Sequence, residues 1–442
     1  MRLRVIALVC CLMPLLAQPL RAQGIIRDAE IEHGLRELAR PLAAVAGLNA
    51  GQLRLILVND RRLNAFVVDG QTIFLHSGLV LRLGSAAELQ AVIAHEMAHI
   101  ANGHITRRGT AAGSAGRGAA GIGLILAAIA GAAGGAEAAA GVALGVAGSA
   151  QGVFFAHTRG EEASADAAGL RYMAAAGVDP QAAADVLALF RGQEALRPNR
   201  QDAYVQTHPL TRDRLRAVEA FVAGWKGTPR TDPNAAYWFA RLQAKLDAFT
   251  RNPGDVLRRT PGSDTSDAAT IRRAVALHRQ GETDQALAEI DRMIARRPKD
   301  GFALETRAQI LLESRRFDAA ARDWGRAAAM APNEPLILGG HGRALLAAGR
   351  DREALAVLER AATRDPADPR ILRDLATAYS KAGQNGMAAL ASAERYAIVG
   401  RLPDAGPLAT RAAGMLPQGS PAWRRAQDII RATEVASKRR KP

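Results

Sequence analysis

The C-terminal part of the 442-residue chain carries an internal repeat with a period of 34 residues. Proline recurs with this spacing at Pro298, Pro332 and Pro366. Four further series share it: Ala286, Ala320, Ala354 and Ala388; Leu277, Leu311, Leu345 and Tyr379; Gly281, Arg315, Gly349 and Gly383; Ala274, Ala308, Gly342 and Ala376. Small residues, a glycine turn and a closing proline are typical of a repeated helix pair that buries its apolar face only by stacking on its neighbours.

This pattern resembles the tetratricopeptide repeat, whose 34-residue unit consists of two helices. The resemblance implies an all-α superhelix over residues 267–442, with about four repeats plus a terminal helix. The concave face of such an array binds extended peptides or partner proteins. A helical spacer without a binding role is the alternative. Four prolines between residues 226 and 266 predict a connecting segment with one helix near Ala235–Phe249.

The first 22 residues have the pattern of a secretory signal peptide. Two arginines precede an apolar stretch from Val5 to Ala17, and cleavage is expected near Ala22. The two cysteines of the chain, Cys10 and Cys11, lie inside this segment. We therefore expect an exported chain that has no disulfide and relies on packing, or on a metal, for local rigidity.

Short strands and one long helix are predicted next along the chain. Leu53–Asn59 and Thr72–His76 read as strands, with Asp69-Gly70 as the hairpin turn between them. The run Ser85–Glu88 has the pattern of a capping box, which satisfies free backbone N–H groups at a helix start. The helix that it opens is expected to run to about Arg107.

This helix carries His-Glu-Met-Ala-His at positions 95–99. Positions four apart share one face of a helix, so His95 and His99 can present two imidazoles to one zinc ion while Glu96 faces its water. A catalytic zinc needs a third protein ligand. The metzincin position for that ligand holds Ile105, and we expect His104 to be a structural or surface residue.

The third ligand is expected from Thr158–Asp166, which opens a second helix. Glu162 is the candidate ligand. Asp166 follows four residues later on the same face and is expected to accept a hydrogen bond from a ligating imidazole, which fixes its tautomer. Glu161 competes with Glu162, although the helix dipole also explains an acidic residue at this position.

Residues 111–150 are rich in alanine and glycine, which hold 28 of the 40 positions. Two interpretations stay open: a lid or membrane-associating helical pair, and a transmembrane hairpin within residues 118–156.

The net charge of +15 comes almost entirely from arginine and reports solubility rather than fold. We expect no nucleic-acid partner. The tail Lys438–Lys441 is expected to be solvated, with contact to an anionic membrane surface as the alternative.

The metal-binding motifs resemble those of the gluzincin-type peptidases, which include the HtpX membrane protease and the CAAX prenyl proteases. The order of export signal, peptidase domain and repeats is similar to the branch of beta-barrel assembly-enhancing proteases. The resemblance implies an α+β zincin-type metallopeptidase domain over residues 23–225, mostly helical with a small edge sheet. It also implies one zinc ion per chain, held by His95, His99 and Glu162, with Glu96 as general base.

Further matches to this family are Asn64-Ala65-Phe66, before the expected edge strand, and His208-Pro209 with Arg214. The resemblance places His208 on a loop near the metal, where it either stabilises the oxyanion or occupies the water position in a resting form. Substrate is expected to add a strand by main-chain hydrogen bonds along the edge formed by Thr72, Ile73, Phe74, Leu75 and His76.

These features together predict a periplasmic zinc metalloendopeptidase that degrades misfolded or stalled outer-membrane beta-barrel proteins. Its expected substrates are unfolded or misassembled outer-membrane proteins, and the repeats are expected to bind the outer-membrane barrel assembly machinery. Two alternatives stay open. One is a chaperone or scaffold of outer-membrane assembly with a latent zinc site, and the other is a zinc protease anchored in the inner membrane.

Overall fold

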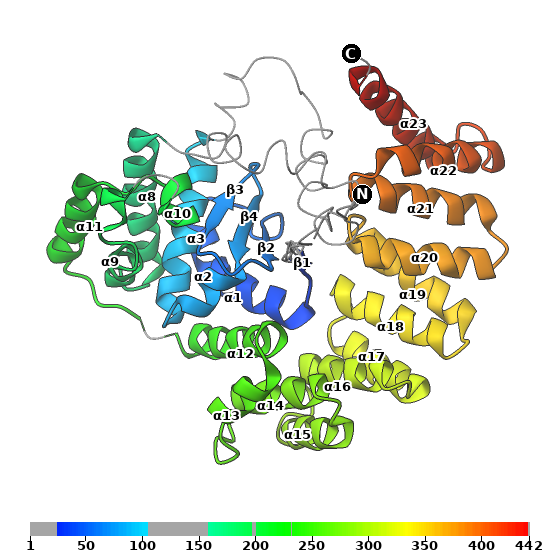
Figure 1. The fold of residues 1–442 in the computed structure, drawn as a ribbon, viewed down its shortest axis with the longest axis horizontal. Coiled ribbons are helices and arrows are strands. Elements are labelled where there is room, and N and C mark those ends of the chain that lie inside the picture. The colour runs from blue at the N-terminus through cyan, green and yellow to red at the C-terminus, as the bar shows by residue number, and fades with distance from the viewer. Residues whose placement is uncertain (1–23, 105–157, 197–199, 231, 441–442) are drawn as a thin grey trace, which may run out of the picture.

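The computed structural model describes residues 24–104, 158–196, 200–230 and 232–440. Figure 1 shows a small sheet with helices packed around it and, beside it, an arc of paired helices. This confirms the predicted fold class. The predicted signal peptide, residues 111–150 and the hairpin within 118–156 lie outside the described residues. Within the ranges that are described, every helix is too short or too polar to cross a bilayer.

The sheet has four strands: β1 (Ile25–Ile26), β2 (Arg54–Val58), β3 (Ala65–Val67) and β4 (Thr72–His76). Their order is β1-β2-β4-β3, with β2 and β4 parallel and the outer pairs antiparallel. The Asp69-Gly70 turn therefore joins β3 to β4. The expectation that it joins the first two predicted strands is wrong.

The expectation that Thr72–His76 forms the sheet edge is also wrong. This strand, β4, pairs with β2 on one side and with β3 on the other, and all five of its residues are buried. A strand whose backbone groups are paired on both sides cannot accept an added strand. The edge on this side of the sheet belongs to β3, whose three residues are too few to give a clear pattern in the sequence.

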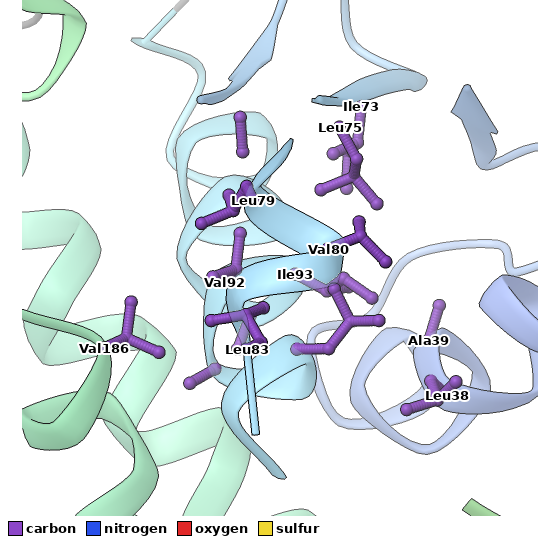
Figure 2. Packing of buried hydrophobic residues seen from close by; sticks show 14 of the residues in the cluster. Leu38, Ala39, Ile73, Leu75, Leu79, Val80, Leu83, Val92, Ile93 and Val186 are labelled. Atoms are coloured by element: carbon purple, nitrogen blue, oxygen red, sulfur yellow. The ribbon is translucent and has the colours of Figure 1, made fainter. Parts of the chain in front are cut away.

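Helices on one face of the sheet supply most of the core. They are α1 (Ala29–Val45), α2 (Ser77–Arg82), α3 (Ala86–Ala101), α8 (Arg159–Ala176), α9 (Gln181–Ala188), α10 (Ala203–Thr207) and α11 (Arg212–Gly224), with a 3-10 turn at Gln193–Ala195. Figure 2 shows Leu38 of α1, Leu75 of β4 and Ile93 of α3 in this core. Burying one such side chain contributes about 1.5–3 kcal/mol, so α3 is held firmly on the sheet.

Helix α3 is shorter than its predicted extent to Arg107. The hydroxyl of Ser85 accepts a hydrogen bond from the backbone N–H of Glu88 at 3.2 Å, which caps the helix start as expected. The helix ends at Ala101, and Gly103 has a φ of +66°. This left-handed conformation suits glycine and turns the chain away from the helix axis.

The predicted connecting segment contains two helices, α12 (Pro233–Thr250) and α13 (Pro253–Arg259), where one was expected. Helix α12 is more than a connection. Its Phe239, Leu242 and Leu246 belong to the core of the N-terminal region, and it also packs against the first repeat helix. The two parts of the chain therefore share this helix.

Four helix pairs follow the 34-residue period: α14 (Asp267–Arg279) with α15 (Thr283–Arg296), α16 (Gly301–Glu313) with α17 (Phe317–Met330), α18 (Pro335–Ala347) with α19 (Asp351–Arg364), and α20 (Pro369–Lys381) with α21 (Asn385–Ile398). Two further helices follow where one was expected, α22 (Leu402–Met415) and α23 (Pro421–Arg440). At the glycine turn position, Arg315 has a φ of 61° and is the one non-glycine residue with positive φ in the described part of the chain.

Candidate active site

Helices α3 and α8 cross closely and bring the two predicted motifs together. The hydroxyl of Thr158 accepts from the backbone N–H of Glu161, whose carboxylate accepts from the backbone N–H of Thr158. Glu161 thus caps α8, while Glu162 is fully buried. Gly169 permits the close approach, because a Cβ there would lie 3.3 Å from the backbone nitrogen of His95.

Four buried side chains form a metal-binding group: His95 and His99 of α3, Glu162 of α8, and His208 after α10. Their ligand atoms all lie within 4.8 Å of one another. Nε2 of His95 is 3.1 Å from Nε2 of His99. The carboxylate oxygens of Glu162 lie 3.4 Å and 3.3 Å from these two nitrogens. Imidazoles and a carboxylate are ligands that zinc takes, so this donor set fits a metal ion.

Asp166 and Arg214 contact the metal-binding group from outside and hold its side chains in place. An oxygen of Asp166 lies 3.0 Å from Nδ1 of His95, which leaves Nε2 to face the other ligands. Arg214 donates to Asp166 at 2.7 Å and lies 2.7 Å from Glu162. Burial disfavours charge on His95, but its hydrogen bonds to Asp166 and Glu162 raise its pKa to about 10. A cation that binds here therefore displaces a proton.

Glu96 is fully buried, and neither of its carboxylate oxygens has a hydrogen-bond partner among the described residues. Nε2 of His208 lies 3.4 Å from one of these oxygens. Burial raises the pKa of Glu96 above its usual value, against the opposing effect of His208 and His95. A buried carboxylate with free acceptor capacity next to a metal-binding group is suited to take a proton from water.

His208 is held in the group by contacts on all sides. Its Nδ1 is 3.1 Å from Glu162 and 3.4 Å from Nε2 of His95. Its Nε2 contacts the carbonyl oxygen of Ala65 at 3.0 Å. The ring of Tyr204 packs on the imidazole with centroids 4.7 Å apart. The structure thus places the loop histidine of the sequence analysis beside the other ligand residues.

The sequence did not predict that His104 lies beside His99 in this site. His104 is 2% exposed, and its Nδ1 lies 2.9 Å from Nδ1 of His99. A continued helix would place it about 140° around the axis from His99. The helix instead ends at Ala101, and the left-handed Gly103 turns the chain so that His104 meets His99. The signal was the Asn-Gly pair after the motif, which is typical of a helix end.

None of the predicted substrate residues belongs to the metal-binding group. His76, at the end of β4, has its Nδ1 3.5 Å from a carboxylate oxygen of Asp60 instead. The edge of β3 faces the site, because the carbonyl oxygen of Ala65 contacts His208. The edge strand nearest to the metal-binding group is therefore β3.

A His-Glu-x-x-His helix with a glutamate from a later helix defines a metallopeptidase site of the gluzincin class. Residues 27–222 match the sequence model of Peptidase family M48. Residues 271–335 and 311–371 match models of the tetratricopeptide repeat. The N-terminal region of this chain therefore belongs to peptidase family M48, and its C-terminal region carries tetratricopeptide repeats.

Two curated relatives share a name. The beta-barrel assembly-enhancing protease of Yersinia pestis is 26% identical over 67% of this chain and 61% of its own. A Vibrio cholerae protein given that name provisionally is 30% identical over 51% of this chain and 50% of its own. The chain thus spans about half the length of the curated relatives that it matches. Among solved structures, MamA matches 37% of this chain and 97% of its own at 18% identity, with a TM-score of 0.31.

Proposed function

We propose that this protein is a zinc metalloendopeptidase of the periplasm that degrades misfolded or stalled outer-membrane proteins. The observation that carries the proposal is the buried metal-binding group with the carboxylate of Glu96 beside it, which accepts no hydrogen bond from the described residues. The match to family M48 supports peptide hydrolysis. The names of the relatives support the substrate class, and the predicted signal peptide supports the location.

His95, His99 and Glu162 would hold the zinc ion, which when bound polarises the scissile carbonyl and acidifies water. Asp166 accepts the Nδ1 hydrogen of His95 and so keeps that imidazole turned toward the other ligands. Glu96 accepts the proton of the attacking water and delivers it to the leaving amine. Burial favours its protonated form, which helps it to hold this proton between the two steps.

We propose that an unfolded segment of substrate binds along the outer edge of β3 (Ala65–Val67), the side on which no other described strand pairs. Strand addition reads the main chain more than the side chains, so it favours unfolded segments. The contact of Ala65 with His208 places this edge next to the metal-binding group. This position replaces the expected one along Thr72–His76, which lies inside the sheet.

We assign the binding of partner proteins to the repeats, with the outer-membrane barrel assembly machinery as the proposed partner. The repeat matches support protein binding, and the names of the relatives support the assembly context. Repeat arrays of this kind present extended concave surfaces.

A chaperone or scaffold with a latent site is the second candidate, and the position of His208 favours it. A catalytic zinc needs an open position for water. His208 lies 3.1 Å from Glu162 and can fill that position in a resting form. Release of His208 would leave its imidazole free to stabilise the oxyanion.

The test is zinc content together with casein cleavage for wild type, Glu96→Gln, His208→Ala and the exposed control Glu219→Gln. We expect one zinc per chain in all four proteins and a loss of cleavage of at least about 100-fold in Glu96→Gln. Faster cleavage by His208→Ala would show that this histidine restrains the site. Cleavage by Glu96→Gln at the wild-type rate would exclude the peptidase. Zinc without cleavage in every protein would favour the scaffold.

A further inference from the structure

The two ligand histidines of α3 are supported in different ways. Nδ1 of His95 lies 3.0 Å from the carboxylate of Asp166, whereas Nδ1 of His99 lies 2.9 Å from Nδ1 of His104. Two ring nitrogens at this distance share one hydrogen, so one of them donates and the other accepts. If Nδ1 of His99 is the donor, its Nε2 keeps a free lone pair that faces the metal-binding group; if Nδ1 is the acceptor, it does not.

Geometry decides which imidazole donates. Nε2 of His99 is the atom that lies 3.1 Å from His95 and 3.3 Å from Glu162, so it is the ligand atom and must be unprotonated to bind a cation. Its Nδ1 therefore carries the hydrogen, and Nδ1 of His104 accepts it. We propose that His104 is a positioning residue that fixes the tautomer and ring orientation of His99.

The surroundings of His104 are built for this contact. The positive φ of Gly103 directs the chain toward α3, and the side chain of Asn102 donates to Ser164 of α8 at 3.0 Å, which ties the turn to the second ligand helix.

The test is zinc affinity, measured on the full chain by competition with a chromophoric chelator. We expect His104→Ala to weaken zinc binding by about 10- to 100-fold. His104→Gln keeps an acceptor oxygen and should recover most of the affinity. The control is His341→Gln, a partly buried histidine in α18 of the repeats, which should bind zinc as wild type does.

Wild-type affinity in His104→Ala would overturn the proposal. So would a loss of affinity that His104→Gln does not restore, because a packing role does not depend on an acceptor. This inference rests on the proposed metal site, yet the two can fail separately. A wild-type protein that binds zinc without cleaving casein refutes the peptidase and leaves the role of His104 testable by affinity.

A different observation, in the repeats, carries a second inference. Asp300, Glu334 and Asp368 are 34 residues apart and occupy the N-cap positions of α16, α18 and α20. We call these three residues the acidic ladder. The same register holds uncharged residues at both ends of the array, Ser266 before α14 and Leu402 at the start of α22.

Each member of the acidic ladder pairs with an arginine from α12, from α1 or from the segment just before α1. The pairs are Arg241 with Asp300 at 2.5 Å, Arg36 with Glu334 at 2.5 Å, and Arg27 with Asp368 at 3.2 Å. In Figure 1, α16, α18 and α20 belong to the arc of repeat helices that lies beside the sheet and α1. Acidic residues thus occupy this register in three successive repeats, and each of them meets an arginine of the N-terminal region or of α12.

Helix capping accounts for only part of the acidic ladder. Asp300 and Asp368 each cap a helix with Oδ1 and offer Oδ2 to the arginine. Glu334 makes no side-chain cap bond at all. The pairs also differ in exposure, since the side chain of Arg241 is 1% exposed and those of Arg27 and Arg36 are 19% and 38% exposed. Exposed ion pairs are weak and screened by salt.

We infer that the acidic ladder is a latch between the repeats and the peptidase region. The buried pair at Asp300 stays closed. The pairs at Glu334 and Asp368, whose arginines are partly exposed although Asp368 itself is buried, open to let the outer repeats swing away from α1. The mature chain is expected to lack cysteine, so Arg216→Cys in α11 and Met415→Cys in α22 can carry a pair of distance labels. Both positions are at least half exposed.

We expect one narrow distance distribution for the labelled chain at low salt, and a broader, longer one for Glu334→Arg. The charge swap, Glu334→Arg with Arg36→Glu, should restore the narrow distribution. Glu353→Arg is the matched control, because it breaks the exposed Arg350–Glu353 pair within α19 and leaves the latch intact. An unchanged distribution in Glu334→Arg, or a swap that fails to restore it, would overturn the latch.

Discussion

Two buried clusters of charge, the metal-binding group and the cluster around α12, differ in how they are neutralised. Around α12, Arg241 and Lys245 contact the carboxylates of Asp28, Glu30, Asp300 and Glu305 at distances of 2.5–3.3 Å. Each of these carboxylates therefore has a cation of the chain beside it. We call this set the interdomain cluster, because its members come from α1 and its N-cap, α12, and α16 and its N-cap.

The metal-binding group is incomplete by comparison. Glu96 has no hydrogen-bond partner among the described residues, and Glu162 takes part of its positive surroundings from His95, which must lose a proton when a metal binds. A buried cluster that is already neutralised stabilises one arrangement of the chain. A cluster that lacks a cation is prepared for a ligand.

The largest expected effect is at Lys245, which is fully buried and contacts three carboxylates. Lys245→Met leaves these carboxylates without their shared cation and should lower the free energy of unfolding by about 3–5 kcal/mol. Urea unfolding measures this loss. The control is Lys381→Met in the exposed pair with Asp351, where a loss under about 1 kcal/mol is expected. Equal losses in both variants would remove the distinction between the clusters.

In the metal-free protein, substitution of Glu96 is expected to raise the free energy of unfolding, whereas substitution of Lys245 lowers it. Burial raises the pKa of this carboxyl in the folded state, so its contribution to stability is present below the unfolded pKa of 4.5 and is lost as pH rises through the folded pKa. Glu96→Gln removes this penalty and should raise the free energy of unfolding at pH 7 by about 1 kcal/mol. Thermal unfolding with Glu219→Gln as control tests the sign. A destabilised Glu96→Gln would show that the carboxylate is already neutralised.

An effect of similar size, seen only in acid, concerns His33, which packs between Trp238 and Phe302 beside the interdomain cluster. Burial, together with Arg36 and Arg241, lowers its pKa to about 4. The unfolded chain therefore binds a proton more readily, and stability falls as pH drops from 6.5 toward 4. We expect His33→Gln to reduce this fall by about 1 kcal/mol in urea unfolding at several pH values. His278→Gln, in an exposed pair, is the control.

The residues that the sequence placed well are those fixed by local spacing. His95 and His99 are four apart on one helix, and Glu162 and Asp166 are four apart on another, so each pair shares a face whatever the tertiary structure does. The 34-residue period likewise predicts the repeated helix pairs, because each unit is defined by contacts with its neighbours.

The features that the sequence misplaced depend on the rest of the fold. Whether Thr72–His76 lies at an edge depends on where β3 pairs, and a strand of three residues gives almost no periodic signal. The position of His104 depends on one backbone conformation at Gly103. The prolines near α12 indicated a connection, although Leu242 and Leu246 belong to the core. Local pattern does not report such distant partners.

Helix α1 has a consequence for the order in which this chain can fold. Ala29 packs in the apolar cluster of the repeats and Ile31 packs in the core of the peptidase region. Arg27, just before the helix, pairs with Asp365, 338 residues further along. The first helix of the described residues therefore gains its last contacts only after about four-fifths of this sequence has emerged. Closing so long a loop is slow because its entropy must be lost before the contact is gained. The peptidase region therefore gains the last contacts of α1 only after the repeats have been synthesised and have folded against it.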